Sequence, residues 1–198
     1  MKPLSILISF LIGFLCGMIP FSYIIAIIRG IDLKKIGSGN IGATNLGRAL
    51  GLPFFILGFL LDGVKGFLPV MVLKSTELFP AIAGAGAILG HIFNPIFKFK
   101  GGKGVSTTIG VILALEPKLF FISLLVWIII YFITYIVSLA SMSMTVTLLV
   151  STFITKKIGL DEKILFWLIG LLVIFAHRDN IKRLIKNTEP KTIFWRRE

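Results

Sequence analysis

Residues 119–155, LFFISLLVWIIIYFITYIVSLASMSMTVTLLVSTFIT, form a run of 37 residues without a charged side chain. A helix crosses a hydrocarbon core of about 30 Å with about 20 residues, so this run is too long for one crossing and suits a tight hairpin of two. Of the 198 residues in the chain, 56% are hydrophobic and 15% are charged. Soluble domains carry about 25% charged residues. The composition therefore indicates an all-α integral membrane protein and excludes a soluble enzyme, a disordered chain and a secreted disulfide scaffold.

Five more segments are apolar enough to be candidate spans. A retained, uncleaved helix with a kink at Pro20 is expected over residues 3–28, because this run is longer than a signal-peptide core and no small-residue cleavage site follows it. The other four segments are residues 53–73, 78–93, 104–115 and 164–177. The prediction is a bundle of about seven transmembrane helices, or of six or five if the two short segments re-enter or lie flat. No internal repeat or linker divides the chain, so residues 1–198 are expected to form a single domain.

The distribution of Lys and Arg predicts the orientation of these spans. With seven crossings, 14 Lys and Arg residues lie on the side that holds the C-terminal tail and 6 lie on the opposite side. Cytoplasmic loops of membrane proteins are enriched in Lys and Arg. The expected topology therefore has the N-terminus outside and the C-terminus in the cytoplasm. The net charge of +12 follows from this bias and needs no nucleic acid, because the aromatic–basic interleaving of RNA-binding proteins is absent.

Three clusters rich in glycine, hydroxyl or basic residues follow spans on the predicted cytoplasmic side. The first, residues 37–48, reads GSGNIGATNLGR and contains a G-x-G-x-x-G pattern. No βαβ unit surrounds that pattern, so a dinucleotide site is rejected. What remains is interpreted as a glycine-rich turn followed by Arg48. Backbone amides in such a turn approach an anion closely, and arginine binds phosphate through a planar fork.

The second cluster, residues 98–108, reads KFKGGKGVSTT and opens directly into an apolar helix. It is not a Walker A loop, since Gly104 stands where that motif requires Ser or Thr. The free amides and dipole of a helix N-terminus still favour a phosphate group there. The alternative interpretation is a flexible loop that obeys the positive-inside rule.

The third cluster, residues 177–183, reads HRDNIKR and is followed by Glu189. His177, Asn180 and Arg183 are spaced i, i+3 and can share one helix face. A basic helix resting on anionic headgroups is the competing interpretation.

Two smaller features also carry polar groups into the membrane. Asp62 and Lys65 stand i, i+3 near the middle of a span and can form an ion pair, which would be functional or would tie the helix to the bundle. Ser138 and Ser141 fall near the expected turn of the hairpin, over residues 135–141, where serines often join helices.

The chain resembles the PlsY family of bacterial acyl-phosphate:glycerol-3-phosphate acyltransferases. The segments SGNIGATNLGR, GGKGVSTTIG and HRDNIKRL carry the resemblance, with Glu189 and the lesser matches around Asp62 and His91. Two departures are Ser106, where the family more often has Ala, and one residue inserted between Phe93 and Pro95. Neither His91 nor His177 is followed by Asp at the fifth position, so the H-x-x-x-x-D dyad of other glycerophosphate acyltransferases is missing.

The resemblance implies transfer of a fatty acyl group from acyl phosphate to the 1-hydroxyl of glycerol 3-phosphate, which gives lysophosphatidate and phosphate at the cytoplasmic face of a bacterial inner membrane. It implies no cofactor or metal, and no nucleic-acid or obligate protein partner. The residues expected to act in catalysis are Ser38, Arg48, His177 and Asn180. Those expected to bind substrates are Asn40, Thr44, Asn45, Gly101, Gly102, Lys103, Gly104, Thr107, Ser138, Ser141 and Arg183. Asp62, Lys65 and Glu189 are expected to be structural.

Two alternatives remain open from the residues themselves. The hydroxyl proton could pass to His177 or to the phosphate of the donor. A transporter of small organic anions would use similar basic loops, although such proteins usually show inverted repeats and a site at mid-membrane.

Overall fold

The computed structural model describes residues 3–155 and 159–194, and every regular element in these ranges is helical. The chain divides into two compact units. The first unit comprises Met1–Leu115 with Phe194–Glu198, and the second comprises Glu116–Ile193. The expectation that residues 1–198 form one functional domain stays a prediction.

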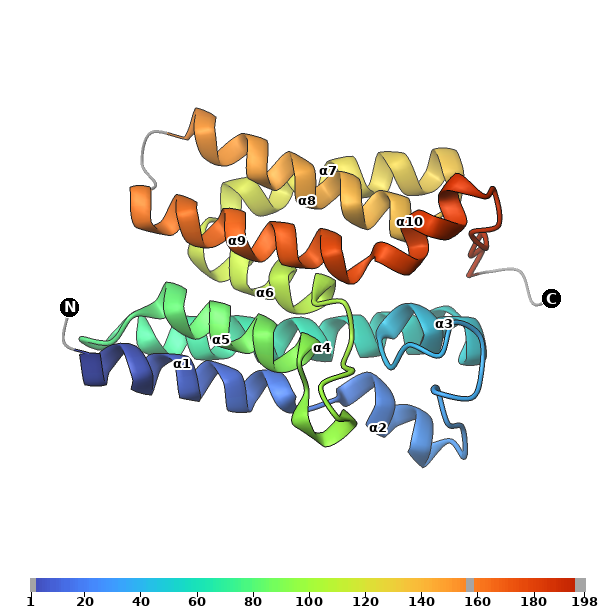
Figure 1. The fold of residues 1–198 in the computed structure, drawn as a ribbon, viewed down its shortest axis with the longest axis horizontal. Coiled ribbons are helices and arrows are strands. Elements are labelled where there is room, and N and C mark those ends of the chain that lie inside the picture. The colour runs from blue at the N-terminus through green and yellow to red at the C-terminus, as the bar shows by residue number, and fades with distance from the viewer. Residues whose placement is uncertain (1–2, 156–158, 195–198) are drawn as a thin grey trace. The chain divides into compact units, whose positions relative to one another are not determined.

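The first unit contains α1 (Pro3–Met18), α2 (Phe21–Ile28), α3 (Ala43–Leu50), α4 (Leu52–Leu73), α5 (Pro80–Ile92), the 3₁₀ turn η1 (Pro95–Phe97) and α6 (Val105–Leu115). Figure 1 shows α1 and α5 side by side, with the bend between α1 and α2 at one end of α1. The bend falls at the predicted Pro20, because proline supplies no amide hydrogen to the helix.

Small residues let α1 and α5 approach closely. A Cβ atom added to Gly13 would lie 1.8 Å from the carbonyl oxygen of Ala83, and one added to Gly86 would lie 2.3 Å from that of Phe10. Membrane helices use small residues in this way because lipid offers no hydrophobic drive for association. Gly13 of α1 and Gly86 of α5 are therefore required by packing.

The short helix α6 packs along only the second half of α4. The main chain of Ser106, near its start, lies against Gly63 in the middle of α4. At its other end the Lys74 Nζ–H, just after α4, donates to the carbonyl of Ala114. The segment that precedes α6 consequently lies level with the middle of α4, rather than with its first turn.

The second unit contains α7 (Pro117–Thr134), α8 (Val137–Ile154), α9 (Leu160–Ala176) and α10 (Arg178–Ile185). Helices α7 and α8 form the predicted hairpin, with a turn confined to residues 135–136. Helix α9 begins four residues before the predicted span, because its first turn holds charged residues that an uncharged-run criterion leaves out.

Five helical segments in the described residues are long and apolar enough to cross a membrane, and α9 with α10, bent by 54°, makes a sixth candidate. Helix α6 is a shorter apolar helix of 11 residues, about 16 Å long. The chain is thus a multi-helix integral membrane protein.

Candidate active site

The first glycine-rich cluster is a loop that ends in a helix. Gly37 and Gly39 have φ angles of +53° and +69°, in the left-handed region that favours glycine, and they flank Ser38. The sequence predicted a glycine-rich turn up to Arg48. This prediction is wrong for residues 43–50, which form the helix α3. Arg48 lies in the last turn of α3.

Asn45 holds this loop together. Its Oδ1 accepts the backbone N–H of Ser38 at 3.1 Å, and its Nδ2 donates to the carbonyls of Leu33 and Ile36 at 3.0 and 3.1 Å. Asn45 is 2% exposed. These contacts give the side chain a bracing role within the loop.

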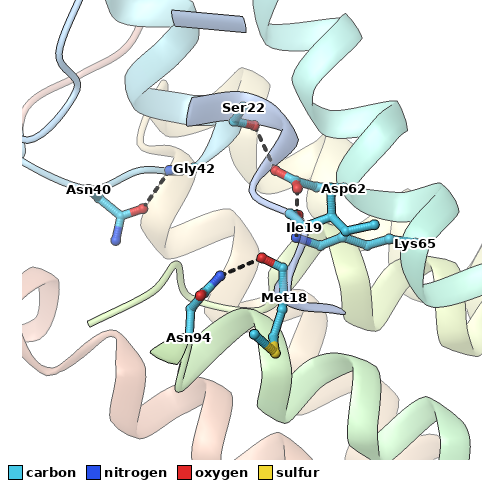
Figure 2. Close-up of polar contacts among 8 residues, drawn as sticks. All are labelled: Met18, Ile19, Ser22, Asn40, Gly42, Asp62, Lys65 and Asn94. Carbon is cyan, nitrogen blue, oxygen red and sulfur yellow. Dashed lines mark hydrogen bonds and ion pairs between the residues drawn. The ribbon is translucent and has the colours of Figure 1, made fainter. Parts of the chain in front are cut away.

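Asn40 lies in the loop before α3, and Thr44 lies in the first turn of that helix. Asn40 Oδ1 accepts the Gly42 N–H at 3.0 Å, as Figure 2 shows, and turns the chain into the helix. Asn40, Thr44 and Arg48 are partly exposed, and Ser38 is exposed. The predicted polar residues of the first cluster therefore lie on one short loop–helix segment.

The second cluster folds back onto the end of α5. The Gly101 and Gly102 amides donate to the carbonyls of Ile92 and His91 at 2.9 and 3.1 Å. A Cβ atom on Gly101 would lie 2.0 Å from the His91 carbonyl oxygen, and one on Gly102 would lie 2.1 Å from His91 Nε2. Close packing against His91 therefore requires glycine at both positions, which the sequence pattern alone does not reveal.

The loop then opens into α6. Gly104 has a φ of +81°, and the first helical hydrogen bond of α6 runs from Thr108 N–H to the Gly104 carbonyl at 2.8 Å. The amides before it have no carbonyl partner inside the helix. Within the described residues, the buried hydroxyls of Thr107 and Thr108 make no hydrogen bond. The start of α6 therefore offers main-chain and side-chain donors for an anion.

Aromatic and cationic contacts join these two loops within the first unit. The Tyr23 and Phe97 rings meet edge to face with centroids 4.9 Å apart, and Lys34 Nζ lies 4.1 Å from the Phe97 centroid. The Tyr23 hydroxyl donates a hydrogen bond to Asp32 Oδ1 at 3.3 Å. Sequence reasoning missed these residues, since no motif or periodicity relates them.

The third cluster, in the second unit, is organised by Glu189. Its Oε1 accepts the Ser138 hydroxyl at 2.7 Å and the Asn180 Nδ2–H at 2.6 Å, and its Oε2 accepts the Arg183 Nε–H at 2.6 Å. Ser138 is on α8, so Glu189 ties α8 to α10. Ser141, one turn further along α8, accepts the Trp127 Nε1–H at 3.2 Å.

His177 lies at the junction of α9 and α10 and is 2% exposed. Its Nδ1 is 2.8 Å from the carbonyl oxygen of Val173. A carbonyl only accepts hydrogen bonds, so Nδ1 carries the proton in the neutral ring and the lone pair is on Nε2. The tautomer of His177 is thereby fixed.

The pKa of Glu189 is lowered by its partners. Burial alone would raise this pKa, but the hydrogen bonds from Ser138, Asn180 and Arg183 and the charge of Arg183 outweigh it. A lowered pKa in the folded protein means that the ionised carboxylate stabilises the fold at neutral pH. That stabilisation is lost as the pH falls below the ordinary value of 4.5 and through the folded pKa.

Glu189→Gln should therefore lower the free energy of unfolding by about 3 kcal/mol near pH 7. The donors on Ser138, Asn180 and Arg183 would then meet a neutral amide in place of a carboxylate. The difference from wild type should shrink as the pH falls below the folded pKa. Thermal unfolding in detergent from pH 3 to pH 8 measures both effects, with exposed Glu77 changed to Gln as the control. An equal loss at every pH would contradict the role of the carboxylate.

Comparison with known proteins identifies the family. The family model described as glycerol-3-phosphate acyltransferase matches residues 7–187. The chain belongs to the glycerol-3-phosphate acyltransferase family. It is 40% identical to the glycerol-3-phosphate acyltransferase of Aquifex aeolicus over 96% of this chain and 100% of that one. The protein of this name from Thermosipho melanesiensis is 42% identical over 93% of this chain and 91% of the other.

Solved structures agree with this family. The crystal structure of PlsY, an integral membrane glycerol 3-phosphate acyltransferase, in its glycerol 3-phosphate form matches with a TM-score of 0.89, 38% identity and 96% coverage of both chains. The lysophosphatidic acid form of PlsY matches with a TM-score of 0.87. The resemblance to PlsY noted in the sequence is confirmed, and this acyltransferase family accounts for the chain without invoking transport.

Proposed function

We propose that this protein transfers a fatty acyl group from acyl phosphate to the 1-hydroxyl of glycerol 3-phosphate, giving lysophosphatidate and inorganic phosphate. Both polar substrates carry phosphate, which suits two glycine-rich clusters with basic side chains. The observation that carries the donor assignment is the start of α6, where main-chain amides and the buried Thr107 hydroxyl have no partner in the described residues.

We assign the acyl phosphate to the second cluster, with Gly101, Gly102, Lys103, Gly104 and Thr107 around its phosphate. Glycerol 3-phosphate is assigned to Ser38 and Arg48 together with His177 and Asn180. Asn40, Thr44, Ser138, Ser141 and Arg183 support these groups, and Asn45 acts by bracing the loop that presents Ser38. Arg48 would bind phosphate through its planar guanidinium fork.

We infer direct transfer without an acyl-enzyme. An acyl phosphate is a mixed anhydride, so the hydroxyl oxygen attacks the carbonyl carbon, the carbon–oxygen bond to phosphate breaks, and phosphate leaves with that bond's electron pair. The hydroxyl proton passes to His177 Nε2 or to the departing phosphate. The enzyme then contributes orientation of the two reactants and stabilisation of the charge on oxygen.

The proposed setting is a bacterial inner membrane, crossed seven times, with the N-terminus outside and the active site and C-terminus at the cytoplasmic face. The parallel pairing of α1 with α5 and of α4 with α6 supports alternating crossings for the spans of the first unit. The excess of Lys and Arg on one side supports the orientation. The account needs no cofactor and no protein partner.

Purified protein should convert glycerol 3-phosphate to lysophosphatidate when acyl phosphate is supplied, and should release one phosphate for each lipid formed. Acyl-CoA of the same chain length should support no turnover above background. Mass spectrometry of the lipid and a phosphate assay measure the two products. Turnover with acyl-CoA but not with acyl phosphate would contradict the proposed donor.

A further inference from the structure

The break between α1 and α2 leaves main-chain carbonyls that need donors from elsewhere. Helix α1 ends at Met18 and α2 begins at Phe21, with Pro20 between them. A helix leaves its last carbonyls without partners of its own, so the carbonyls at the end of α1 need donors from other segments. Inside a membrane such groups must be satisfied by protein.

Two buried side chains supply those donors, one from α4 and one from the segment between α5 and η1. Lys65 Nζ–H donates to the Ile19 carbonyl at 2.7 Å, and Asn94 Nδ2–H donates to the Met18 carbonyl at 2.6 Å. Figure 2 shows both contacts converging on the break. The exposed fractions of Lys65 and Asn94 are 3% and 1%.

Asp62 completes this network, which we call the break network. Its Oδ1 lies 2.9 Å from Lys65 Nζ, and its Oδ2 accepts the Ser22 hydroxyl at 2.6 Å (Figure 2). A cation thus lies at the C-terminal end of α1 and a carboxylate beside the first turn of α2, as the helix dipoles favour. The ion pair therefore stabilises both sides of one helix break.

The break network contacts two segments, and each of them leads into one glycine-rich loop. Helix α2 leads directly into residues 29–42, the loop that carries Ser38. Asn94 begins the second loop, since its Oδ1 accepts the Ile96 N–H at 3.0 Å and its main-chain oxygen accepts the Phe99 N–H at 2.9 Å. The contacts of the break network therefore set the spacing between the two loops.

We infer that Ser22, Asp62, Lys65 and Asn94 are positioning residues that fix the distance between the two phosphate-binding loops. A pair of charges is a costly way to join helices, and apolar packing joins them as well or better. If these residues only joined helices, the charges would have no explanation. Donating hydrogen bonds to the free carbonyls of a broken helix, by contrast, requires polar groups. The inference rests on the proposed function only in taking both loops as substrate sites.

The test compares two buried serines on the same broken helix. Ser22→Ala removes the hydroxyl that donates to Asp62. Ser9→Ala removes a hydroxyl that accepts the Phe79 N–H at 3.0 Å near the other end of α1. Both serines are at most 1% exposed. Ser22→Ala should speed hydrogen exchange in residues 29–42 and 94–104 about fivefold, the factor for one net hydrogen bond.

The same variants separate positioning from general stability in kinetics. Ser22→Ala should raise KM for both acyl phosphate and glycerol 3-phosphate, whereas Ser9→Ala should leave both KM values unchanged even where it lowers Tm equally. Lys65→Met should have the larger effect on both loops, with Lys74→Met as its control. The inference is overturned if Ser22→Ala changes neither loop exchange nor either KM relative to Ser9→Ala.

Exchange is measured without substrate, so the two proposals fail separately. Faster exchange in both loops of Ser22→Ala supports the positioning role even if wild-type protein does not turn over acyl phosphate, a result that would remove only the proposed function. Normal exchange with normal turnover would remove only the positioning role.

Discussion

Gly101→Ala is expected to lower kcat/KM for acyl phosphate by at least about 100-fold, the cost of displacing a binding loop by about 1 Å. The added methyl group would lie 2.0 Å from the main-chain oxygen of His91, which has no rotamer to move out of the way. The loop must shift instead, and with it the start of α6. Initial rates at varied acyl phosphate measure the loss, and circular dichroism checks that the helices persist.

Gly102→Ala provides an internal comparison, because its methyl group would meet the His91 ring rather than the main chain. Adding His91→Ala should restore most of the activity of Gly102→Ala and none of that of Gly101→Ala. Gly159→Ala, where nothing lies within 4 Å, should behave as wild type. A Gly101→Ala enzyme with wild-type KM for acyl phosphate would contradict this placement of the donor.

His177→Ala is expected to lower kcat by about 10²–10⁴-fold, the usual contribution of a general base. The hydrogen bond from Nδ1 to the Val173 carbonyl holds the ring so that Nε2 is its basic nitrogen. The variant should also change the shape of the pH–rate profile, to which a general base contributes. A smaller loss with an unchanged profile would identify the donor's phosphate as the proton acceptor.

Hydropathy predicted the positions of the apolar helices well, because an uncharged run long enough to span a bilayer is rarely found outside a membrane helix. The break at Pro20 and the hairpin of α7 and α8 follow from this local information. Helix α3 was missed, since its glycine and asparagine residues have weak helix propensity. It is stabilised by packing on α4 and by its own Asn45, whose amide braces a loop seven residues earlier.

The residues of the candidate site were predictable as types, but their roles were not. Motif spacing indicated Asn180 and Arg183 on one face, and the structure adds that Glu189 binds both. Nothing in the sequence relates Asn94 to Met18, because the carbonyl that needs a donor exists only once the helix has broken. Contacts between distant segments depend on packing, which single-sequence patterns do not contain.

Direct transfer is most directly tested by initial rates at varied concentrations of both substrates. If acyl phosphate and glycerol 3-phosphate are bound together, double-reciprocal plots at several fixed concentrations of the second substrate should give lines that intersect. Incubation with acyl phosphate alone should release no stoichiometric burst of phosphate and leave no ester on Ser38, Thr44, Thr107, Ser138 or Ser141. Parallel lines with a trapped acyl ester would contradict the account.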